Sequence, residues 1–204
     1  ELKPIDHFTY TFLGDGCLME GVSHEACSFA GTHRLGKLIC FYDQNGISID
    51  GEITNWFTDD TRQRFESYNW QVLEVDGHNI EKVLEAIQTA KKDVERPTLI
   101  CCKTIIGFGS PNKSGTSGVH GAALGEDEVK KTRVELGWDH EPFHVPDEIK
   151  SEWDGKVAGA ELNASWDKLM KDYSEKHPES FKELKRVINN ELPINFEDTY
   201  KDFI

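Results

Sequence analysis

The sequence predicts an α/β fold in which helices flank a parallel sheet, followed by a mainly helical C-terminal segment. From residue 7 to residue 104, short apolar runs rich in β-forming residues alternate with stretches whose apolar residues recur at helical spacing. Such alternation predicts βαβ crossovers, which make neighbouring strands parallel and place helices on both faces of the sheet. We therefore expect residues 1–137 to belong to the α/β domain and residues 138–204 to form an irregular connector and helices.

The first two expected strands enclose a helix. Residues 7–13 form an apolar run that ends in Gly-Asp-Gly, and Lys37–Asp43 form a second buried strand. Between them, residues 19–34 have the pattern of a helix, because apolar side chains recur at Val22, Ala26, Phe29 and Ala30.

Two further helix and strand pairs follow. Thr58 and the two aspartates after it suit a helix N-terminus, and residues 70–75 form a third strand. Residues 79–93 carry a clear apolar stripe at helical spacing, and Pro97 separates this helix from a fourth strand at residues 98–104.

The character of the sequence changes after Lys103. Residues 105–125 are rich in glycine and form a long loop, and loops of that length within a domain are usually functional or disordered. A helix is expected at Glu126–Leu136, then an irregular stretch at 137–148 and charged helices over roughly 150–190.

Composition limits the partners. The 204 residues include 23 basic and 37 acidic side chains, a formal charge of −14 at pH 7. Such a surface repels nucleic acids and anionic membranes, so we expect neither as a partner. No apolar stretch reaches the roughly 18 residues of a membrane span, and the first ten residues lack a signal pattern. The five cysteines form no CxxC pair, which favours a reducing compartment, the cytoplasm.

Polar residues follow the first two expected strands. Asp15 comes directly after the first and Asn45 after the second, with one crossover between them. Because ligands bind beyond the carboxyl ends of strands in open parallel sheets, we expect the two side chains to converge. Carboxylate and amide oxygens suit Mg²⁺, and Gly14 and Gly16 let the backbone approach a diphosphate. Taken singly, Gly-Asp-Gly is a common turn, and Asn45-Gly46 is equally typical of a hairpin turn.

Longer motifs point to one enzyme family. They are GDGCLMEGVSHEACSFAG, LICFYDQNGISIDG, WFTDDTRQRFESYNW, VDGHN, CKTIIGFGSPNKSGT and VHGAALG. Together they resemble the transketolase family of thiamine-diphosphate enzymes, in the second half of its N-terminal diphosphate-binding domain, from about His7 to Pro193. Gln44 stands where that family often has Asp, and Ala123 where it usually has Pro.

The resemblance implies the site residues. Asp15 and Asn45 would ligate Mg²⁺ through their side chains and Ile47 through its main-chain oxygen, with Ca²⁺ as an alternative ion. Gly16 would donate its N–H to the cofactor diphosphate, which makes it cofactor-binding together with Asn45. His120 would contact the diphosphate and the sugar substrate, as both a cofactor-binding and a catalytic residue.

Three other residues have roles that the resemblance suggests. Ile49 would press against the middle of the cofactor, although a plain core role is about equally favoured. Glu20 and Glu25 resemble a pair of acidic residues near the interface of the family's homodimer. Acidic residues near a helix N-terminus also favour the helix dipole, so that alternative stays open.

The family moves a two-carbon ketol unit from a ketose phosphate to an aldose phosphate in the pentose phosphate pathway, and thiamine diphosphate carries the carbon chemistry. Complete members are much longer, so the resemblance implies a fragment that lacks the pyrimidine-binding and C-terminal domains and is inactive alone. The resemblance also implies that residues 138–204 include the start of the interdomain linker. Two other interpretations stay open. One is another thiamine-diphosphate enzyme, such as 1-deoxyxylulose-5-phosphate synthase or a 2-oxo acid dehydrogenase component, and the other is a non-catalytic fragment.

Overall fold

The computed structural model describes residues 2–204, which fall into two compact units. One unit is His7–Glu141, and the other combines residues 2–6 with Pro142–Ile204. Each unit is considered by itself below.

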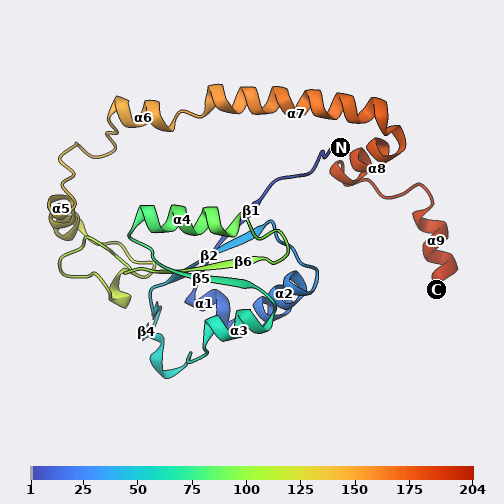
Figure 1. Ribbon diagram of the computed structural model, residues 1–204. Coiled ribbons are helices and arrows are strands. Elements are labelled where there is room, and N and C mark those ends of the chain that lie inside the picture. Colours follow the sequence, from blue (N-terminus) through green and yellow to red (C-terminus); the bar gives the residue numbers. More distant parts are fainter. Residues whose placement is uncertain (1) are drawn as a thin grey trace. The chain divides into compact units, whose positions relative to one another are not determined.

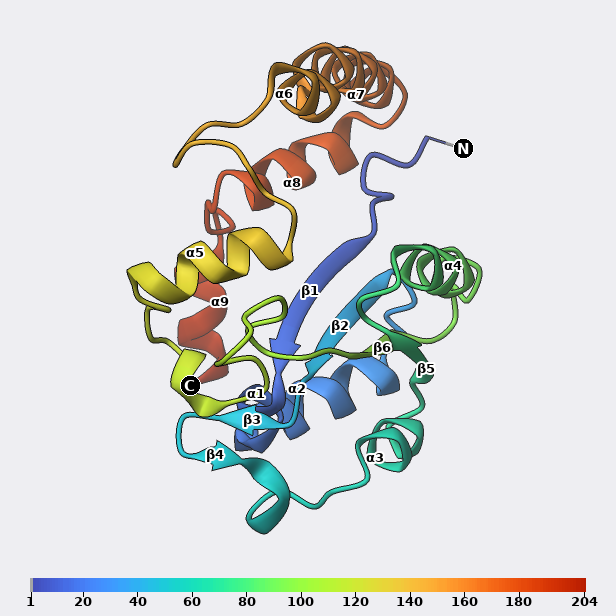
Figure 2. The same ribbon diagram turned by 90° about the vertical axis from the view of Figure 1, so that its left-hand side faces the viewer.

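A parallel sheet forms the centre of the first unit (Figures 1 and 2). Within the described residues it has four strands in the order β1-β2-β6-β5, and all three pairings are parallel. The strands are β1 (Thr9–Gly14), β2 (Leu38–Gln44), β6 (Thr98–Lys103) and β5 (Gln71–Asp76). The register pairs Gly14 with Asp43 and Asp43 with Cys102, so the carboxyl ends of β1, β2 and β6 lie at one edge of the sheet.

Helices cover both faces of this sheet, as Figure 1 shows. On one face lie α1 (Asp15–Met19), α2 (Gly21–Thr32) and α3 (Thr61–Ser67), and on the other lies α4 (Ile80–Ala90). The first face buries a cluster that includes Leu18, Tyr42, Phe65, Trp70 and Leu99, and the second a cluster of Ile39, Ala86, Ala90, Ile100 and Cys102. The predicted parallel α/β fold is therefore confirmed.

The helix predicted over residues 19–34 is confirmed as α2, which begins and ends two residues inside those bounds. The short helix α1 was not expected; it begins immediately after β1. Glu20 has extended backbone angles, φ −73° and ψ 133°, and separates α1 from α2.

The apolar stripe of α2 does not face the sheet. Val22 and Phe29 are 68% and 59% exposed, whereas Ala30 and Gly31 are buried. The reason is close packing: a β-carbon at Gly31 would lie only 1.7 Å from the main-chain oxygen of Tyr68. Small residues therefore form the buried side of α2, and its large apolar side chains remain at the surface.

A short hairpin follows β2. It consists of β3 (Ile47–Ser48) and β4 (Gly51–Glu52), which pair antiparallel, and is followed by the 3-10 turn η1 (Ile53–Asn55). Because β2 pairs with β1 and β6 and not with β3, the alternative that Asn45-Gly46 is a hairpin turn between two paired strands is wrong. The hairpin is too short to show the alternation that reveals a strand in a sequence.

After β6 the chain forms the predicted long loop. It contains one 3-10 turn, η2 (Ser117–Val119), and leads into α5 (Glu126–Glu135), close to the expected helix.

The second unit is helical, as predicted. Its helices are α6 (Asp147–Trp153), α7 (Lys156–Lys176), α8 (Pro178–Ile188) and α9 (Phe196–Phe203), of which the last was not expected. The indole N–H of Trp166 donates to the carbonyl of Pro4 at 3.3 Å, which ties α7 to the first residues of the chain. Among residues 2–204, no helix combines the length and the apolar character needed to cross a membrane.

Candidate functional site

Asp15 is held between two neighbouring strand ends. It begins α1 directly after β1, and its side chain is only 3% exposed. Its Oδ1 accepts a hydrogen bond from the hydroxyl of Tyr42 in β2, and its Oδ2 accepts one at 2.9 Å from the N–H of Gly46 in the turn after β2. The carboxylate of Asp15 thus connects the end of β1 to the last part of β2, through Tyr42, and to the turn after β2, through Gly46.

Tyr42 is well suited to hold that carboxylate. The ring is 1% exposed and packs in the same cluster as Leu18 and Phe65. Burial, with the hydrogen bond to Asp15 and its negative charge, raises the pKa of Tyr42, so its hydroxyl stays protonated and donates.

Asn45 is oriented by its own surroundings. Its Oδ1 accepts from the N–H of Ile47 at 2.9 Å, and its Nδ2 donates to Oδ2 of Asp43 at 3.2 Å. Asp43 in turn accepts a hydrogen bond from the hydroxyl of Thr104, just after β6. Asn45, which follows β2, is therefore connected through Asp43 to Thr104 at the end of β6.

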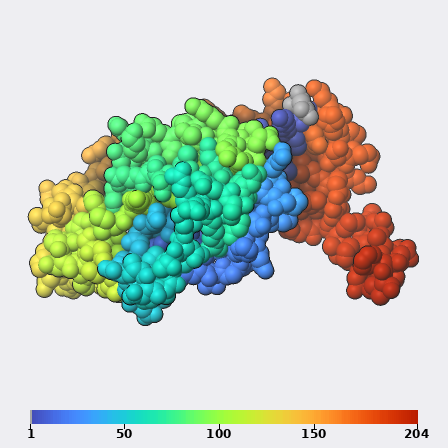
Figure 3. All heavy atoms as spheres, turned by 60° about the horizontal axis from the view of Figure 1, so that its bottom comes forward, coloured from blue at the N-terminus to red at the C-terminus, as the bar shows by residue number. Residues whose placement is uncertain are grey.

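A cavity of about 650 Å³, here called the edge cavity, lies beyond these strand ends. It is lined by every metal, cofactor or catalytic residue expected from the sequence, and by Ile49: Asp15, Gly16, Asn45, Ile47, Ile49 and His120. Trp56, Ile106 and Val119 supply apolar wall. Segments that are far apart in the sequence, around residue 50 and around residue 120, lie beside each other there (Figure 3).

The edge cavity has free space next to two of its glycines, Gly14 and Gly16. A β-carbon added at Gly14 or Gly16 would meet no heavy atom within 4 Å. Space of that kind next to backbone lets a bulky anion approach main-chain N–H groups closely.

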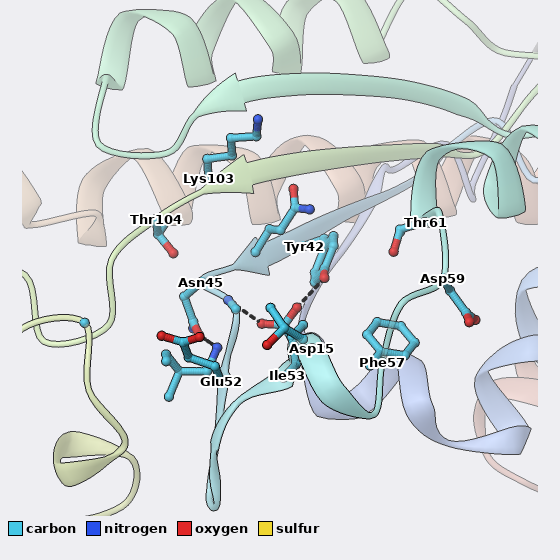
Figure 4. A pocket seen from close by; sticks show the side chains of 15 residues that line it. Asp15, Tyr42, Asn45, Glu52, Ile53, Phe57, Asp59, Thr61, Lys103 and Thr104 are labelled. Carbon is cyan, nitrogen blue, oxygen red and sulfur yellow. Dashed lines mark hydrogen bonds between the residues drawn. The ribbon is translucent and has the colours of Figure 1, made fainter.

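A second cavity of about 620 Å³, the inner cavity, shares Asp15, Asn45 and Ile47 with the first (Figure 4). Thr61 and Asp59 lie on one side of it and Lys103 and Thr104 on the other. Gln44 also lines it, and among the buried side-chain nitrogens and oxygens of residues 2–204 only Gln44 Oε1 lacks a hydrogen-bond partner.

His120 comes from the long loop. It follows η2, its main-chain N–H donates to the carbonyl of Ser117 at 3.0 Å, and its side chain is exposed. Glu20 and Glu25 are exposed too and line no part of the edge cavity.

The donor set fits a hard divalent cation. Asp15 offers a carboxylate, Asn45 an amide oxygen and Ile47 a main-chain carbonyl, all of them oxygen ligands of the kind that Mg²⁺ and Ca²⁺ prefer. In the part of the chain that the structure describes, no three His, Cys, Asp or Glu side chains form a metal-binding cluster. That finding does not bear on this set, because only one of its three members belongs to those residue types.

Three supporting residues were missed by sequence reasoning: Tyr42, Asp43 and Thr104. All three were assigned only to strands. The side-chain bond from Tyr42 to Asp15 spans 27 residues and the one from Thr104 to Asp43 spans 61, whereas the bond between Asn45 and Asp43 is local. The Asp43-Gln44-Asn45 run was the one local signal, since Asp and Asn often bond to nearby backbone and side chains in turns.

A parallel sheet with Gly-Asp-Gly at the end of one strand and Asn after the next, both lining one cavity, is typical of α/β domains that bind a diphosphate cofactor. The family model described as "Transketolase, thiamine diphosphate binding domain" matches residues 1–193, and the chain belongs to that family.

Individual relatives agree. The chain is 57% identical over 201 residues to "Transketolase 2" of Vibrio vulnificus (strain CMCP6) and 55% identical over 201 residues to "Transketolase 1" of Vibrio cholerae, in each case over 98% of this chain and 30% of the relative. The chain therefore spans about 30% of the length of these curated relatives.

Solved structures show the same fold. A transketolase from Pichia stipitis, in complex with sedoheptulose-7-phosphate, has a TM-score of 0.88 and 43% identity over 97% of this chain and 30% of its own. A transketolase from Leishmania mexicana has a TM-score of 0.88 and 35% identity over the same shares. The expected family and fold class are confirmed, and the chain is part of a thiamine-diphosphate-binding domain.

Proposed function

We propose that the complete protein carrying this chain is a transketolase that moves a two-carbon ketol unit from a ketose phosphate to an aldose phosphate in the pentose phosphate pathway. This chain contributes the half-site that holds the diphosphate of thiamine diphosphate and its Mg²⁺, with Ca²⁺ as a substitute. The observation that carries the proposal is the edge cavity, where Asp15, Gly16, Asn45, Ile47 and His120 meet. Family membership supports the reaction.

In this proposal, three oxygens hold the metal: a carboxylate oxygen of Asp15, Oδ1 of Asn45 and the carbonyl of Ile47. Tyr42 and Gly46 keep the carboxylate of Asp15 in place, so this ligand needs little reorganisation on binding. Because the chain has a formal charge of −14, a diphosphate needs such a cation near it.

The remaining residues act on the ligands directly. Gly16 donates its N–H to the diphosphate across the open space above it. Ile49, which is 75% exposed, and Trp56 form an apolar wall that excludes water once the cavity is filled. When bound, thiamine diphosphate supplies the nucleophilic carbon and the electron sink for breaking a carbon–carbon bond.

His120 is the residue that acts on the substrate. Its imidazole binds the sugar hydroxyls and holds or moves a proton at them, and it also donates to the diphosphate. A positioned histidine of this kind contributes about 10² to 10⁴ in rate.

The exposed face of α2 supports a homodimer in the complete protein. Val22, Ala26 and Phe29 form an apolar surface on it, Glu20 is the N-cap residue of the helix, and Glu25 lies in its second turn. An exposed apolar patch with polar neighbours is typical of a subunit interface. The relatives' greater length supports the further proposal that pyrimidine-binding and C-terminal domains complete the enzyme.

The compartment proposed is the cytoplasm. Cys40, Cys101 and Cys102 are buried free thiols, and no cysteine of residues 2–204 takes part in a disulfide. Free buried thiols are typical of proteins from reducing compartments.

Calorimetric titration of thiamine diphosphate into the complete protein, with and without Mg²⁺, tests the proposal. We expect metal-dependent binding that weakens at least tenfold in Asp15→Ala and in Asn45→Ala. Asp167→Ala and Asn163→Ala replace the same residue types on the exposed surface of α7 and should bind like the parent. Equal affinity with and without metal, or unchanged binding in both site variants, would contradict the proposed half-site.

A further inference from the structure

A buried carboxylate that does not line the edge cavity is bonded to the loop that carries His120. Glu128 in α5 is only 7% exposed, although it belongs to a strongly acidic first turn whose neighbours Glu126 and Asp127 are exposed. A carboxylate is rarely buried unless it is paired or hydrogen-bonded, so its partners indicate its role.

The partners of Glu128 all belong to the loop. Its Oε1 accepts from the hydroxyl of Ser110 and, at 2.8 Å, from the N–H of Asn112, while its Oε2 accepts from Asn112 Nδ2 at 2.9 Å. Ser110 is itself 3% exposed. These bonds lower the pKa of Glu128 to about 2, the side chain of Asn112 contributing most, so the group is ionised at neutral pH.

Ordinary helix capping does not account for this arrangement. Glu128 is the third residue of α5, where a glutamate commonly bonds back to the main chain at the N-cap. Its three hydrogen bonds go instead to residues 16 and 18 positions earlier in the chain. The carboxylate of Glu128 therefore accepts hydrogen bonds from the loop and caps no main-chain N–H of its own helix.

Lys113 connects the early part of the loop to its last residues. The ammonium group of Lys113 donates to the carbonyl of Leu124 at 2.7 Å, and the main-chain N–H of Lys113 donates to Ser110 Oγ at 3.2 Å. Residues 114–123, including η2 and His120, lie between the two ends that Lys113 joins. We call Ser110, Asn112, Lys113, Leu124 and Glu128 the loop clasp.

The clasp is continuous with the edge cavity. The N–H of Gly115 donates to the carbonyl of Ile106 at 2.8 Å, and Val119 packs on Gly107, where a β-carbon would lie 3.0 Å from the valine side chain. Ile106, Val119 and His120 all line the cavity. Fixing residues 110–113 therefore fixes the path by which His120 reaches the cavity.

We propose that Glu128 is a positioning residue: through the loop clasp it holds the segment that presents His120 to the edge cavity. It touches neither the metal ligands nor the cavity, so it acts only through the loop. The inference deepens the proposed function and rests on it for the role of His120, but the ordering of the loop is testable without any cofactor.

The test uses the complete protein and five variants, one of which is a control. Glu128→Ala removes all three acceptor bonds, Asn112→Ala removes one of the donors, and the double variant closes a cycle. Glu126→Ala, in the same turn but exposed, is the matched control. Glu128→Gln keeps the shape but loses the charge and one acceptor oxygen, which becomes a donor NH2 group. This milder variant remains informative if Glu128→Ala does not fold.

Amide hydrogen exchange without cofactor is the first readout. We expect exchange at residues 114–120 to rise at least fivefold in Glu128→Ala, with a smaller rise in Glu128→Gln and Asn112→Ala. The double variant should exchange no faster than Glu128→Ala, because the same bonds are already lost. Strand β6 and the Glu126→Ala control should keep the parent's exchange.

Thiamine-diphosphate affinity in the presence of Mg²⁺ is the second readout, and we expect it to fall at least threefold in Glu128→Ala. Exchange at residues 114–120 that matches the parent would overturn the clasp. Faster exchange with unchanged affinity would overturn its role in presenting His120. A parent protein that binds no thiamine diphosphate would overturn the proposed function, while the exchange result would still decide whether the clasp orders the loop.

Discussion

The hydroxyl of Tyr42 donates a hydrogen bond to the carboxylate of Asp15, across 27 positions of sequence and one βαβ crossover. The other oxygen of that carboxylate accepts from Gly46, the residue after Asn45. Asp15 and Asn45 are thus brought together by a bond network built into the adjacent strands β1 and β2, and the geometry of the candidate metal site follows from the register of the sheet.

Tyr42→Phe should loosen Asp15 while leaving every proposed metal ligand in place. The buried carboxylate loses one donor, so we expect about 1–3 kcal/mol of lost stability in urea unfolding. Affinity for thiamine diphosphate with Mg²⁺ should fall several-fold in the same variant. Tyr10→Phe, at a residue that is 44% exposed, is the control. Parent-like stability and affinity in Tyr42→Phe would show that the bond to Asp15 is dispensable.

Two glycine variants should separate binding from folding. Gly16→Ala adds a β-carbon where no heavy atom lies within 4 Å, so its thermal unfolding should match the parent while its cofactor affinity drops. Gly31→Ala forces a β-carbon to within 1.7 Å of the main chain of Tyr68, and we expect a loss of about 1–3 kcal/mol or more. Thermal unfolding together with cofactor titration measures both. The account fails here if Gly16→Ala binds cofactor as tightly as the parent.

The contribution of Glu128 to stability should depend on pH. Because folding lowers its pKa from 4.5 to about 2, the carboxylate stabilises the folded state fully above pH 4.5 and loses that effect as the pH falls towards 2. The difference in unfolding free energy between the parent and Glu128→Gln should therefore be constant from pH 7 down to about 5.5 and shrink below pH 4.5. Urea unfolding at several pH values measures it, and a difference that grows on acidification would refute the assignment.

One thiol should react much faster than the other four. Cys17 is exposed and lines the edge cavity, whereas burial raises the pKa of both Cys40 and Cys101 to about 12 and also raises the pKa of Cys27 and Cys102. A thiol reagent at pH 8 should give one fast phase, absent in Cys17→Ser and slowed by thiamine diphosphate with Mg²⁺. A fast phase that the cofactor leaves unchanged would argue against cofactor in the edge cavity.

The isolated 204-residue chain should show no ketol transfer. It spans about 30% of the length of its curated relatives, and Phe12 and Phe29 are exposed on its surface, as we expect where further parts of a complete enzyme pack. A turnover assay on the purified chain, with the complete protein as the positive control, checks this expectation. Measurable transfer by the chain alone would contradict it.

The sequence was sufficient for the sheet because its strands are apolar runs bounded by clear turn residues. The expected strand at residues 70–75 differs by one residue from β5, and the expected helix at Glu126–Leu136 by one residue from α5. Asp15 and Asn45 were also predictable, since each directly follows a strand and parallel strands end at one edge.

Other features depend on contacts that no local pattern encodes. Val22 and Phe29 have the spacing of a buried helix face, yet Gly31 decides which side of α2 can approach Tyr68. Tyr42 and Glu128 gain their roles only from partners 27 and 16 to 18 residues away. Hydrophobic periodicity in a sequence indicates which residues are buried, but it does not indicate which residues they contact. The hydrogen-bonding roles of Tyr42 and Glu128 could therefore be found only from the structure.

A crystal structure of the complete protein with thiamine diphosphate and Mg²⁺ tests the central claim most directly. We expect the metal to be bound by a carboxylate oxygen of Asp15, Oδ1 of Asn45 and the carbonyl of Ile47, at about 2.0–2.1 Å from each. The diphosphate should lie over Gly16 within reach of His120. A metal and diphosphate bound away from Asp15 and Asn45 would contradict the account.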